Sequence, residues 1–348
     1  MRLYSLSLLN FRNLVTPSLC FKGGITGVVG PNAAGKSNLF HAAYLGLTGE
    51  LVGKRIAESV SLGQEQAHIG VVIENQLGLN SIEVGLSPGR KILKIDGQIA
   101  RTQDISRISS AVLIAPDDAE LIHGSPSKRR GYIDGVLSKL SPRYTVILRE
   151  YNRVVEQRNA CLKSHNAGTS LDIWTERLSN LAQEIDSLRT RVSVRIEELS
   201  NQAYRDIAGP LKPLTITLKR AYGDLPFTEA LIASRPEEKV RGITVVGPHR
   251  DDLDLRLSGH SIQTYGSRGE ARTTALALRI AEFRLLETKH QETPILLLDD
   301  FSAELDASRR EFLLDLANTS SQALVSGTEP PPGTHNDFRI DGGTIVAS

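Results

Sequence analysis

The amino-acid sequence predicts an α/β protein whose nucleotide-binding core is interrupted by a helical arm. Three observations support this fold class: a glycine-rich loop between a strand and a helix, an apolar strand that ends in two acids, and a heptad pattern in mid-chain. The chain has 348 residues, enough for two domains with a sizeable core. Apolar residues make up 40% and charged residues 23%, as in globular proteins.

The glycine-rich loop spans residues 30–37 and reads G-x-x-x-x-G-K-S, the pattern of a phosphate-binding P-loop. The β-branched run 25–29 predicts a strand before it, and residues 39–45 predict a helix after it. A glycine-rich turn could match the loop pattern by chance, but the flanking strand and helix favour phosphate binding. We expect Lys36 to contact the β- and γ-phosphates of ATP and Ser37 to bind Mg²⁺. The expected nucleotide-binding loop comprises Gly30, Pro31, Asn32, Ala33, Ala34, Gly35, Lys36, Ser37 and Asn38.

Short apolar runs around the loop predict a mixed sheet with an antiparallel β-meander beside the P-loop. Turns are expected at residues 10–13, at Asn80 and at Pro88-Gly89. The predicted strands span residues 3–9, 18–22, 25–29, 69–73, 82–84, 91–97 and 111–114.

The middle of the chain predicts a helical arm over residues 117–210, which leaves residues 1–116 and 211–348 for the nucleotide-binding head. Ser141-Pro142 is a helix start, and the helix is expected to run to about Lys163. After a turn at 164–170, apolar residues recur at alternating spacings of three and four, which indicates a second helix packed against the first as an antiparallel hairpin. The seam comprises Leu171, Trp174, Leu178, Leu181, Ile185, Leu188 and Val192.

The arm is the basic part of a chain whose net charge is only +1. Residues 121–220 carry 17 Lys and Arg against 10 Asp and Glu, a local charge of +7. Such a surplus is also common on solvated helix surfaces, but it favours a DNA-binding surface. The DNA-binding candidates are Lys128, Arg129, Arg130, Arg143 and Arg149, in a basic stretch that continues to Arg153 and Arg158.

Cysteine content and hydropathy indicate a cytoplasmic protein. The two cysteines, Cys20 and Cys161, are far apart and fit neither a disulfide framework nor a metal site. The N-terminal residues alternate like a strand rather than a signal peptide, and no apolar run approaches the ~20 residues of a membrane helix.

The last third of the chain predicts a return to strands and helices, beginning at residue 214. Residues 222–242 are expected to be irregular, and the tail after residue 325 is expected to be loose. Strands are expected at 214–218, 243–246, 253–257, 295–298 and 323–325, and helices at 269–289 and 308–316.

Two further polar groups fit a nucleotide site. Asp299 and Asp300 follow the apolar strand 295–298, so Asp299 can bind Mg²⁺ and Asp300 can orient the attacking water. Ser267 and Gly269 begin the helix that carries Glu270, which makes either an anion site or an ordinary helix cap.

The order of these motifs, completed by S-A-E-L-D at 302–306, is similar to that of ABC-type ATPase heads. Within that class the chain resembles the RecF family, which is related to SMC heads but has a short arm. The resemblance spans nearly the whole chain and is carried by N-F-R-N-L at 10–14, G-S-P-S-K-R-R at 124–130, Q-R-N at 157–159, G-P-H-R-D-D at 247–252 and L-D-D at 298–300.

The resemblance implies a homodimer of heads that forms with ATP, binds duplex DNA at gaps or junctions, works with RecR and RecO, and helps to load the recombinase RecA. Each ATP would lie between Lys36 of one copy and Ser267, Gly269 and Glu270 of the other, with Asp306 near the two-fold axis. Arg12 and Asn13 would lie near the adenine or phosphate edge.

Three departures from the wider ABC pattern suggest slow hydrolysis, with ATP acting as a dimer clamp. Asp300 replaces a glutamate, Glu270 replaces a glutamine, and the switch position offers Ser326 or Thr328 rather than histidine. A Q-loop glutamine is not evident near Asp117. The alternatives are an ATP-driving transporter subunit, a P-loop kinase and a nucleotide-gated scaffold that does not hydrolyse ATP.

Overall fold

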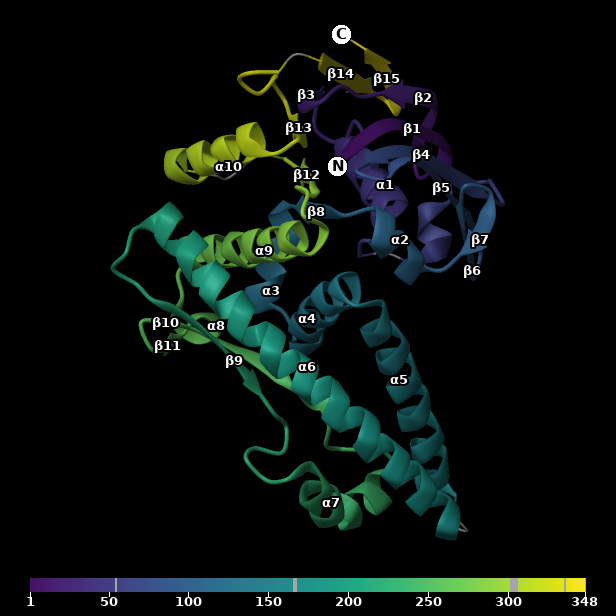
Figure 1. Ribbon diagram of the computed structural model, residues 1–348, viewed down its shortest axis with the longest axis vertical. Coiled ribbons are helices and arrows are strands. Elements are labelled where there is room, and N and C mark those ends of the chain that lie inside the picture. The colour runs from purple at the N-terminus through teal and green to yellow at the C-terminus, as the bar shows by residue number, and fades with distance from the viewer. Residues whose placement is uncertain (54, 165–167, 301–305, 335, 348) are drawn as a thin grey trace. The chain divides into compact units, whose positions relative to one another are not determined.

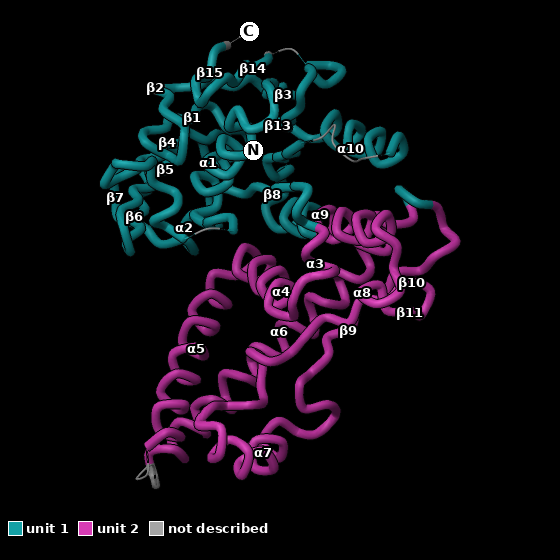
Figure 2. The backbone as a smooth tube through the Cα atoms, turned by 180° about the vertical axis from the view of Figure 1, so that it is seen from behind, with its two compact units in different colours: residues 1–118, 206–208, 282–348 teal, residues 119–205, 209–281 magenta. Residues whose placement is uncertain are grey.

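The computed structural model describes residues 1–53, 55–164, 168–300, 306–334 and 336–347 (Figure 1). The chain divides into two compact units (Figure 2): unit 1 comprises residues 1–118, 206–208 and 282–348, and unit 2 comprises residues 119–205 and 209–281. Unit 2 therefore extends well beyond the range 117–210 expected for the arm. No helix in the described part of the chain is long and apolar enough to cross a bilayer.

The first sheet of unit 1 is antiparallel, with strand order β2-β1-β4-β5-β6-β7, and confirms the predicted meander. In β4, buried Ala67, Ile69, Val71 and Ile73 alternate with more exposed residues, so that one face of the strand is apolar. The prediction of a turn at Asn80 is wrong. The turn between β4 and β5 lies at residues 76–77, where the Asn75 side chain accepts a hydrogen bond from the Leu77 amide at 2.8 Å. The strands are β1 (Arg2–Phe11), β2 (Leu14–Cys20), β4 (Ala67–Asn75), β5 (Gly78–Ser87), β6 (Arg90–Ile95) and β7 (Gln98–Ala100).

The second sheet of unit 1 has the order β15-β14-β3-β13-β12-β8 and is parallel except for β15. The loose tail predicted after residue 325 is wrong, since β14 pairs in parallel with β3 and buries Phe338 and Ile340. The strands are β3 (Gly24–Val29), β8 (Ala111–Ile114), β12 (Ile295–Leu298), β13 (Gln322–Gly327), β14 (Asn336–Asp341) and β15 (Thr344–Ala347).

Helix α1 (Lys36–Thr48) lies between the two sheets and forms the centre of the core of unit 1. It contacts β1, β4 and β5 on one side and β8 and β13 on the other. Gly46 allows the close approach to β4, because a Cβ there would lie 2.6 Å from Val71. Unit 1 also contains η1 (Ile56–Ser59), α2 (Thr102–Ile108), α10 (Ala307–Thr319) and all but the last residue of η2 (Pro116–Ala119).

The helical hairpin of unit 2 consists of α5 (Pro142–Lys163) and α6 (Gly168–Ala208), preceded by α3 (Glu120–His123) and α4 (Pro126–Leu140). Ion pairs between Arg143 and Glu184 and between Glu150 and Arg177 show that α5 and α6 run antiparallel, as predicted. Four residues of the predicted seam, spaced seven positions apart in the sequence, are buried: Leu171, Leu178, Ile185 and Val192.

A small sheet completes unit 2, with the order β11-β10-β9. Its strands are β9 (Leu214–Lys219), β10 (Asp252–Leu257) and β11 (His260–Ser261), and the associated helices are α7 (Phe227–Arg241), η3 (Pro248–Arg250) and α8 (Ile262–Tyr265). Helix α9 (Arg268–His290) contributes residues to both units.

Residues 222–246 differ from the sequence-based expectation. The irregular segment predicted at 222–242 is wrong, because α7 accommodates Pro236 and places Glu238 against Arg158, both with side chains 0% exposed. The strand predicted at 243–246 is also wrong. Side chains of Asn159 and Glu238 accept from the backbone amides of Thr244 and Val245, which therefore take no part in a sheet.

The G-P-H-R-D-D segment 247–252 joins the small sheet to the helices of unit 2. Arg129 on α4 donates two hydrogen bonds to the carboxylate of Asp252, at 2.7 and 2.9 Å. Arg189 on α6 donates to the Pro248 carbonyl at 2.6 Å and forms ion pairs with Asp134 and Asp251. Residues 209–281 are thus bound to α4 and to α6 of the hairpin by charge pairs, which explains why they belong to unit 2.

Candidate nucleotide-binding site

Three parallel strands of the second sheet of unit 1 end at one edge. The P-loop follows β3, Asp299 and Asp300 follow β12, and β13 with Ser326 lies between them. Because carboxyl ends of parallel strands share an edge, these segments meet in one cleft. The cleft has a volume of about 300 Å³ and is lined by Asn32, Ala33, Gly35, Lys36, Ser37, Asn38, Asp299 and Asp300.

The backbone of the P-loop takes left-handed conformations at Ala33 (φ 65°) and Gly35 (φ 115°), just before α1 begins at Lys36. The C-terminal hairpin β14–β15 supports this loop. The Gly343 amide donates to the Ala34 carbonyl at 3.1 Å, and a Cβ at Gly30 would lie 2.2 Å from the Ile340 carbonyl. The prediction missed this support, although Gly342-Gly343 after an alternating strand is a hairpin signal.

Lys36 is folded over the P-loop. Its ammonium group donates to the carbonyls of Gly30 at 2.7 Å and Pro31 at 2.9 Å, and the residue is only 7% exposed. These donors can be transferred to phosphate oxygens, which accept stronger, charge-assisted hydrogen bonds. The position of Lys36 therefore fits an anionic ligand in the cleft.

Ser326 connects the two acids at the far side of the cleft. Its hydroxyl donates to Asp299 Oδ1 at 2.7 Å and accepts from the Asp300 amide at 2.7 Å, and the residue is 1% exposed. Asp300 has a left-handed backbone, with φ 53°. Asp299 and Ser37 line the same cleft, and a carboxylate and a hydroxyl are hard oxygen ligands that fit Mg²⁺.

Arg12 and Asn13 form a polar cluster with the first turns of α1. Arg12 Nη1 lies 2.7 Å from Asn38 Oδ1 and 2.7 Å from His41 Nδ1, and Asn38 donates to Asn13 Oδ1 at 2.7 Å. Burial lowers the pKa of Arg12 from its usual value, and the nearby Glu58 opposes that shift. The two residues lie beside the P-loop, and their contact with a nucleotide remains a prediction.

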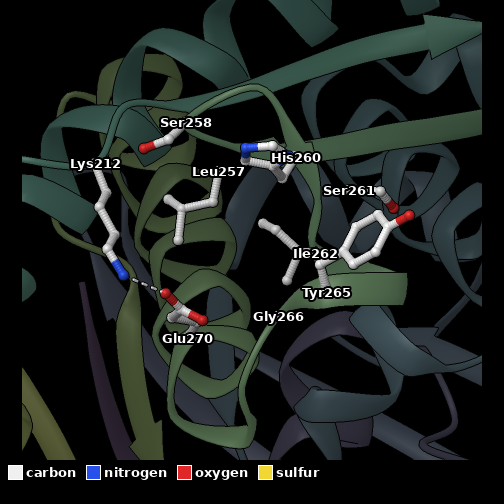
Figure 3. Close-up of a pocket in the computed structure, with 9 residues that line it drawn as sticks. All are labelled: Lys212, Leu257, Ser258, His260, Ser261, Ile262, Tyr265, Gly266 and Glu270. Carbon is white, nitrogen blue, oxygen red and sulfur yellow. Dashed lines mark hydrogen bonds and ion pairs between the residues drawn. The ribbon is translucent and has the colours of Figure 1, made fainter.

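The start of α9 lies in unit 2 and forms a capping box. The carboxylate of Glu270 accepts from the Ser267 amide and hydroxyl, both at 2.9 Å, and pairs with Lys212 Nζ at 2.5 Å. These contacts lower the pKa of Glu270 to about 2, with the Lys212 hydrogen bond contributing most. A cleft of about 210 Å³ adjoins this turn (Figure 3).

The third expected nucleotide-binding element lies largely outside the described residues. The S-A-E-L-D run covers residues 302–306, of which the structure describes Asp306. Asp306 caps α10 by accepting from the Arg309 amide at 3.0 Å and pairs with the Arg309 side chain at 2.8 Å.

The five DNA-binding candidates do not form one surface set. Arg129 is a correction: it is 5% exposed and held by Asp252, so it cannot bind DNA. Arg130 is half-buried and donates to the Asp251 carbonyl, while Lys128 and Arg143 are exposed but paired with Glu120 and Glu184. Arg149 is exposed on α5, as is Arg153 one turn later.

Comparisons with known proteins agree with this geometry. The model of the RecF/RecN/SMC N-terminal domain matches residues 2–331. The DNA replication and repair protein RecF of Deinococcus radiodurans is 46% identical over 345 residues, covering 99% of this chain and 95% of the relative. That of Deinococcus deserti is also 46% identical, with the same coverage.

Solved structures extend the comparison to the fold. A structure of the recombination mediator protein RecF-ATP in the RecFOR pathway superposes with a TM-score of 0.92 at 28% identity, over 99% of this chain and 97% of that chain. The SMC head domain of Pyrococcus furiosus shares the fold, with a TM-score of 0.57 at 18% identity. In family and in fold, this chain belongs to the RecF family of ABC-type ATPase heads.

Proposed function

We propose that this protein is an ATP-dependent recombination mediator that binds DNA during replication and repair. The observation that carries the proposal is the cleft in which Lys36, Ser37, Asp299 and Asp300 meet, in a chain 46% identical to RecF proteins over its whole length. One solved structure that this chain resembles is that of the recombination mediator protein RecF with ATP in the RecFOR pathway. We therefore propose ATP as ligand and RecR and RecO as partners.

The proposed chemistry assigns one role to each part of the cleft. Lys36 would bind the β- and γ-phosphates, and Ser37 and Asp299 would hold Mg²⁺, which would neutralise phosphate charge. Asp300 orients the water that attacks the γ-phosphate. Its carboxylate is shorter than a glutamate, and Ser326 replaces the switch histidine, so we propose slow hydrolysis.

We further propose that two copies close on ATP in a symmetric dimer. The P-loop of one copy and the Ser267–Glu270 turn of the other would enclose each nucleotide, with Asp306 near the axis. ATP favours the dimer because it binds that state more tightly than the monomer. The dimer would hold gapped or junction DNA and help to load the recombinase RecA.

Light scattering with no nucleotide, ADP or ATP and Mg²⁺, each with and without duplex DNA, tests the proposal. We expect a dimer with ATP and Mg²⁺, and a monomer with ADP or without nucleotide. Dimerisation should be stronger when DNA is present. Ser267→Arg should bind ATP as a monomer but fail to dimerise, because a bulky cation fills the exposed cap. An ATP-induced dimer in Ser267→Arg, or none in the parent protein, would refute the arrangement.

A transporter ATPase subunit is the alternative, and DNA distinguishes the two functions. A transporter subunit would assemble and hydrolyse ATP to the same extent with and without DNA. A DNA-dependent shift in the size distribution therefore favours the mediator.

A further inference from the structure

The first turn of α9 carries a negative charge where ABC-type heads usually have a neutral glutamine. Glu270 Oε2 accepts from the Ser267 amide and hydroxyl at 2.9 Å, while its Oε1 faces Lys212 Nζ at 2.5 Å. The pKa of Glu270 is lowered to about 2, so the carboxylate is ionised at neutral pH. In the proposed dimer this turn meets the triphosphate of the other copy.

An ionised carboxylate opposes that encounter in two ways. It repels the phosphate charge, and it cancels part of the positive end of the α9 dipole that would attract an anion. It also accepts the hydrogen bond of the Ser267 hydroxyl, which would otherwise be available to a phosphate oxygen. The turn can serve as an anion site only if the charge of Glu270 is balanced.

Lys212 supplies that balance from the segment between α6 and β9. Lys212 and Glu270 line one side of the 210 Å³ cleft, and their side chains point toward each other (Figure 3). Lys212 is the cation among the nine described residues that line this cleft. The side chains are 55% and 24% exposed, so the pair is accessible to a second molecule.

We propose that Lys212 is a positioning residue for ATP bound by a second copy of this chain. Its ammonium group pairs with Oε1 and balances the charge of Glu270, so that the carboxylate repels the phosphates of the other copy less. The inference rests on the proposed ATP-dependent dimer and adds a residue from outside the recognised motifs to its binding surface.

A double-mutant cycle tests the charge relation. ATP-dependent dimerisation would be titrated by light scattering for the parent, Lys212→Met, Glu270→Gln and the double variant. Lys212→Met should raise the ATP concentration for half-dimerisation by about tenfold, the effect expected for one uncompensated charge. In the Glu270→Gln background the same change should have less than about a threefold effect, since no charge remains to balance.

Two controls separate this role from general effects. Lys219→Met removes an exposed lysine from β9 of the same unit and should leave dimerisation unchanged. Lys212→Arg should dimerise like the parent. Binding of a fluorescent ATP analogue to the monomer should be equal in all variants, because the P-loop lies in unit 1.

Dimerisation of Lys212→Met at the ATP concentration of the parent would overturn the inference and leave the proposed function intact. So would an equal loss in Lys212→Met and in the double variant, because Lys212 would then act independently of Glu270. Absence of an ATP-driven dimer in the parent would overturn the proposed function itself, and the inference with it.

Discussion

We propose that nucleotide binding depends most directly on Lys36. Its buried ammonium group donates a hydrogen bond to the Gly30 carbonyl at 2.7 Å. A phosphate oxygen could replace this carbonyl as the acceptor. Lys36→Met should therefore lose ATP affinity by about tenfold or more, the value of a charge-assisted hydrogen bond, while thermal unfolding changes little. Equilibrium binding of an ATP analogue measures this, and unchanged affinity would contradict the P-loop assignment.

A substitution of Asp300 should reduce ATP hydrolysis without reducing ATP binding. Asp300→Asn keeps the shape of the side chain but removes the carboxylate that we propose orients water, so ATP should bind normally and turn over at least about tenfold more slowly. Phosphate release and nucleotide affinity are the two measurements. Hydrolysis at the parental rate would show that another group positions the water.

Ser326 holds both acids through a single hydroxyl, a relation that the sequence could not reveal. In Ser326→Ala, Asp299 loses a 2.7 Å hydrogen bond and the Asp300 amide loses its acceptor. We expect parental ATP affinity, hydrolysis slowed by about tenfold, and destabilisation of about 1 kcal/mol from the unsatisfied groups. Ser326→Thr retains the hydroxyl and should restore turnover, whereas a loss equal to that of alanine would argue against positioning.

His249 should make unit 2 sensitive to acid. Burial lowers its pKa to about 4, and its Nδ1 lies 2.7 Å from the Tyr151 hydroxyl while Nε2 lies 3.1 Å from the Thr244 carbonyl. A neutral ring satisfies both partners by accepting at Nδ1 and donating at Nε2. The pKa of His249 in the folded protein lies below its value in the unfolded chain. Its contribution to the free energy of unfolding should therefore be fully present above pH ~6.5 and be lost as the pH falls toward ~4. The total loss should be up to about 3 kcal/mol.

His249→Gln tests this pH dependence, because its amide can make the same two hydrogen bonds without titrating. Chemical unfolding at pH 7 and pH 5 should show a smaller loss of stability in the variant than in the parent. Burial raises the pKa of Asp251 to about 6, which acts in the opposite direction but equally in both proteins. Equal losses in parent and variant would contradict the role of His249.

The C-terminal hairpin provides a test at the scale of the element. A Cβ at Gly343 would lie 2.1 Å from the Asn13 carbonyl, whereas a Cβ at Gly342 meets nothing within 4 Å. Both glycines have positive φ, at 86° and 53°, so alanine strains either backbone by about 1 kcal/mol. Gly343→Ala alone should also displace the Asn13 turn and the P-loop, and should weaken ATP binding more than the Gly342→Ala control.

Elements with local signals were predictable, and those held by distant partners were not. The P-loop, the heptad seam of α6 and the apolar strand β12 follow from spacing within a few residues. Helix α7 was missed because Pro236 obscures its pattern, and its stability comes from the buried pair of Glu238 with Arg158. Strand β14 was missed because its partner β3 lies about 300 residues away.

The same reasoning applies to the site. Motifs identified Lys36, Asp299 and Asp300, but composition alone placed Arg129 on a DNA-binding surface. A count of basic residues does not distinguish a solvated arginine from one that is buried in an ion pair with an aspartate distant in sequence. Arg129 and Asp252 lie 123 positions apart, and only the fold brings them together.

At the scale of the whole molecule, the two units carry opposite charge. Unit 2 has 25 Lys and Arg against 18 Asp and Glu, a net +7, whereas unit 1 has 16 against 22, a net −6. Proposed DNA binding should therefore reside in unit 2, depend on the phosphate backbone and weaken with salt. Exposed arginines of α5, rather than Arg129, are the expected contacts.

Arg149→Glu with Arg153→Glu tests this expectation. DNA affinity should fall by at least about tenfold, equally for different duplex sequences, and the slope of log affinity against log salt should shrink by about 2. Lys22→Glu with Arg90→Glu makes the same charge change at exposed positions in unit 1 and is the control. An equal effect of both double variants, or binding that is independent of salt, would contradict a DNA surface on unit 2.

The parallel pairing of β3 with β13 has a consequence for biosynthesis. Their paired residues Gly24 and Gln322 are about 300 positions apart, so a ribosome adding roughly 5–20 residues per second exposes β3 for some 15–60 seconds before its partner emerges. All residues of unit 2 lie within this interval, so unit 2 can complete its own core first. The strand that carries the P-loop meanwhile has open edges. We therefore expect that a nascent chain cannot capture ATP until translation is nearly complete, and that its unpaired strand is prone to aggregation during that time.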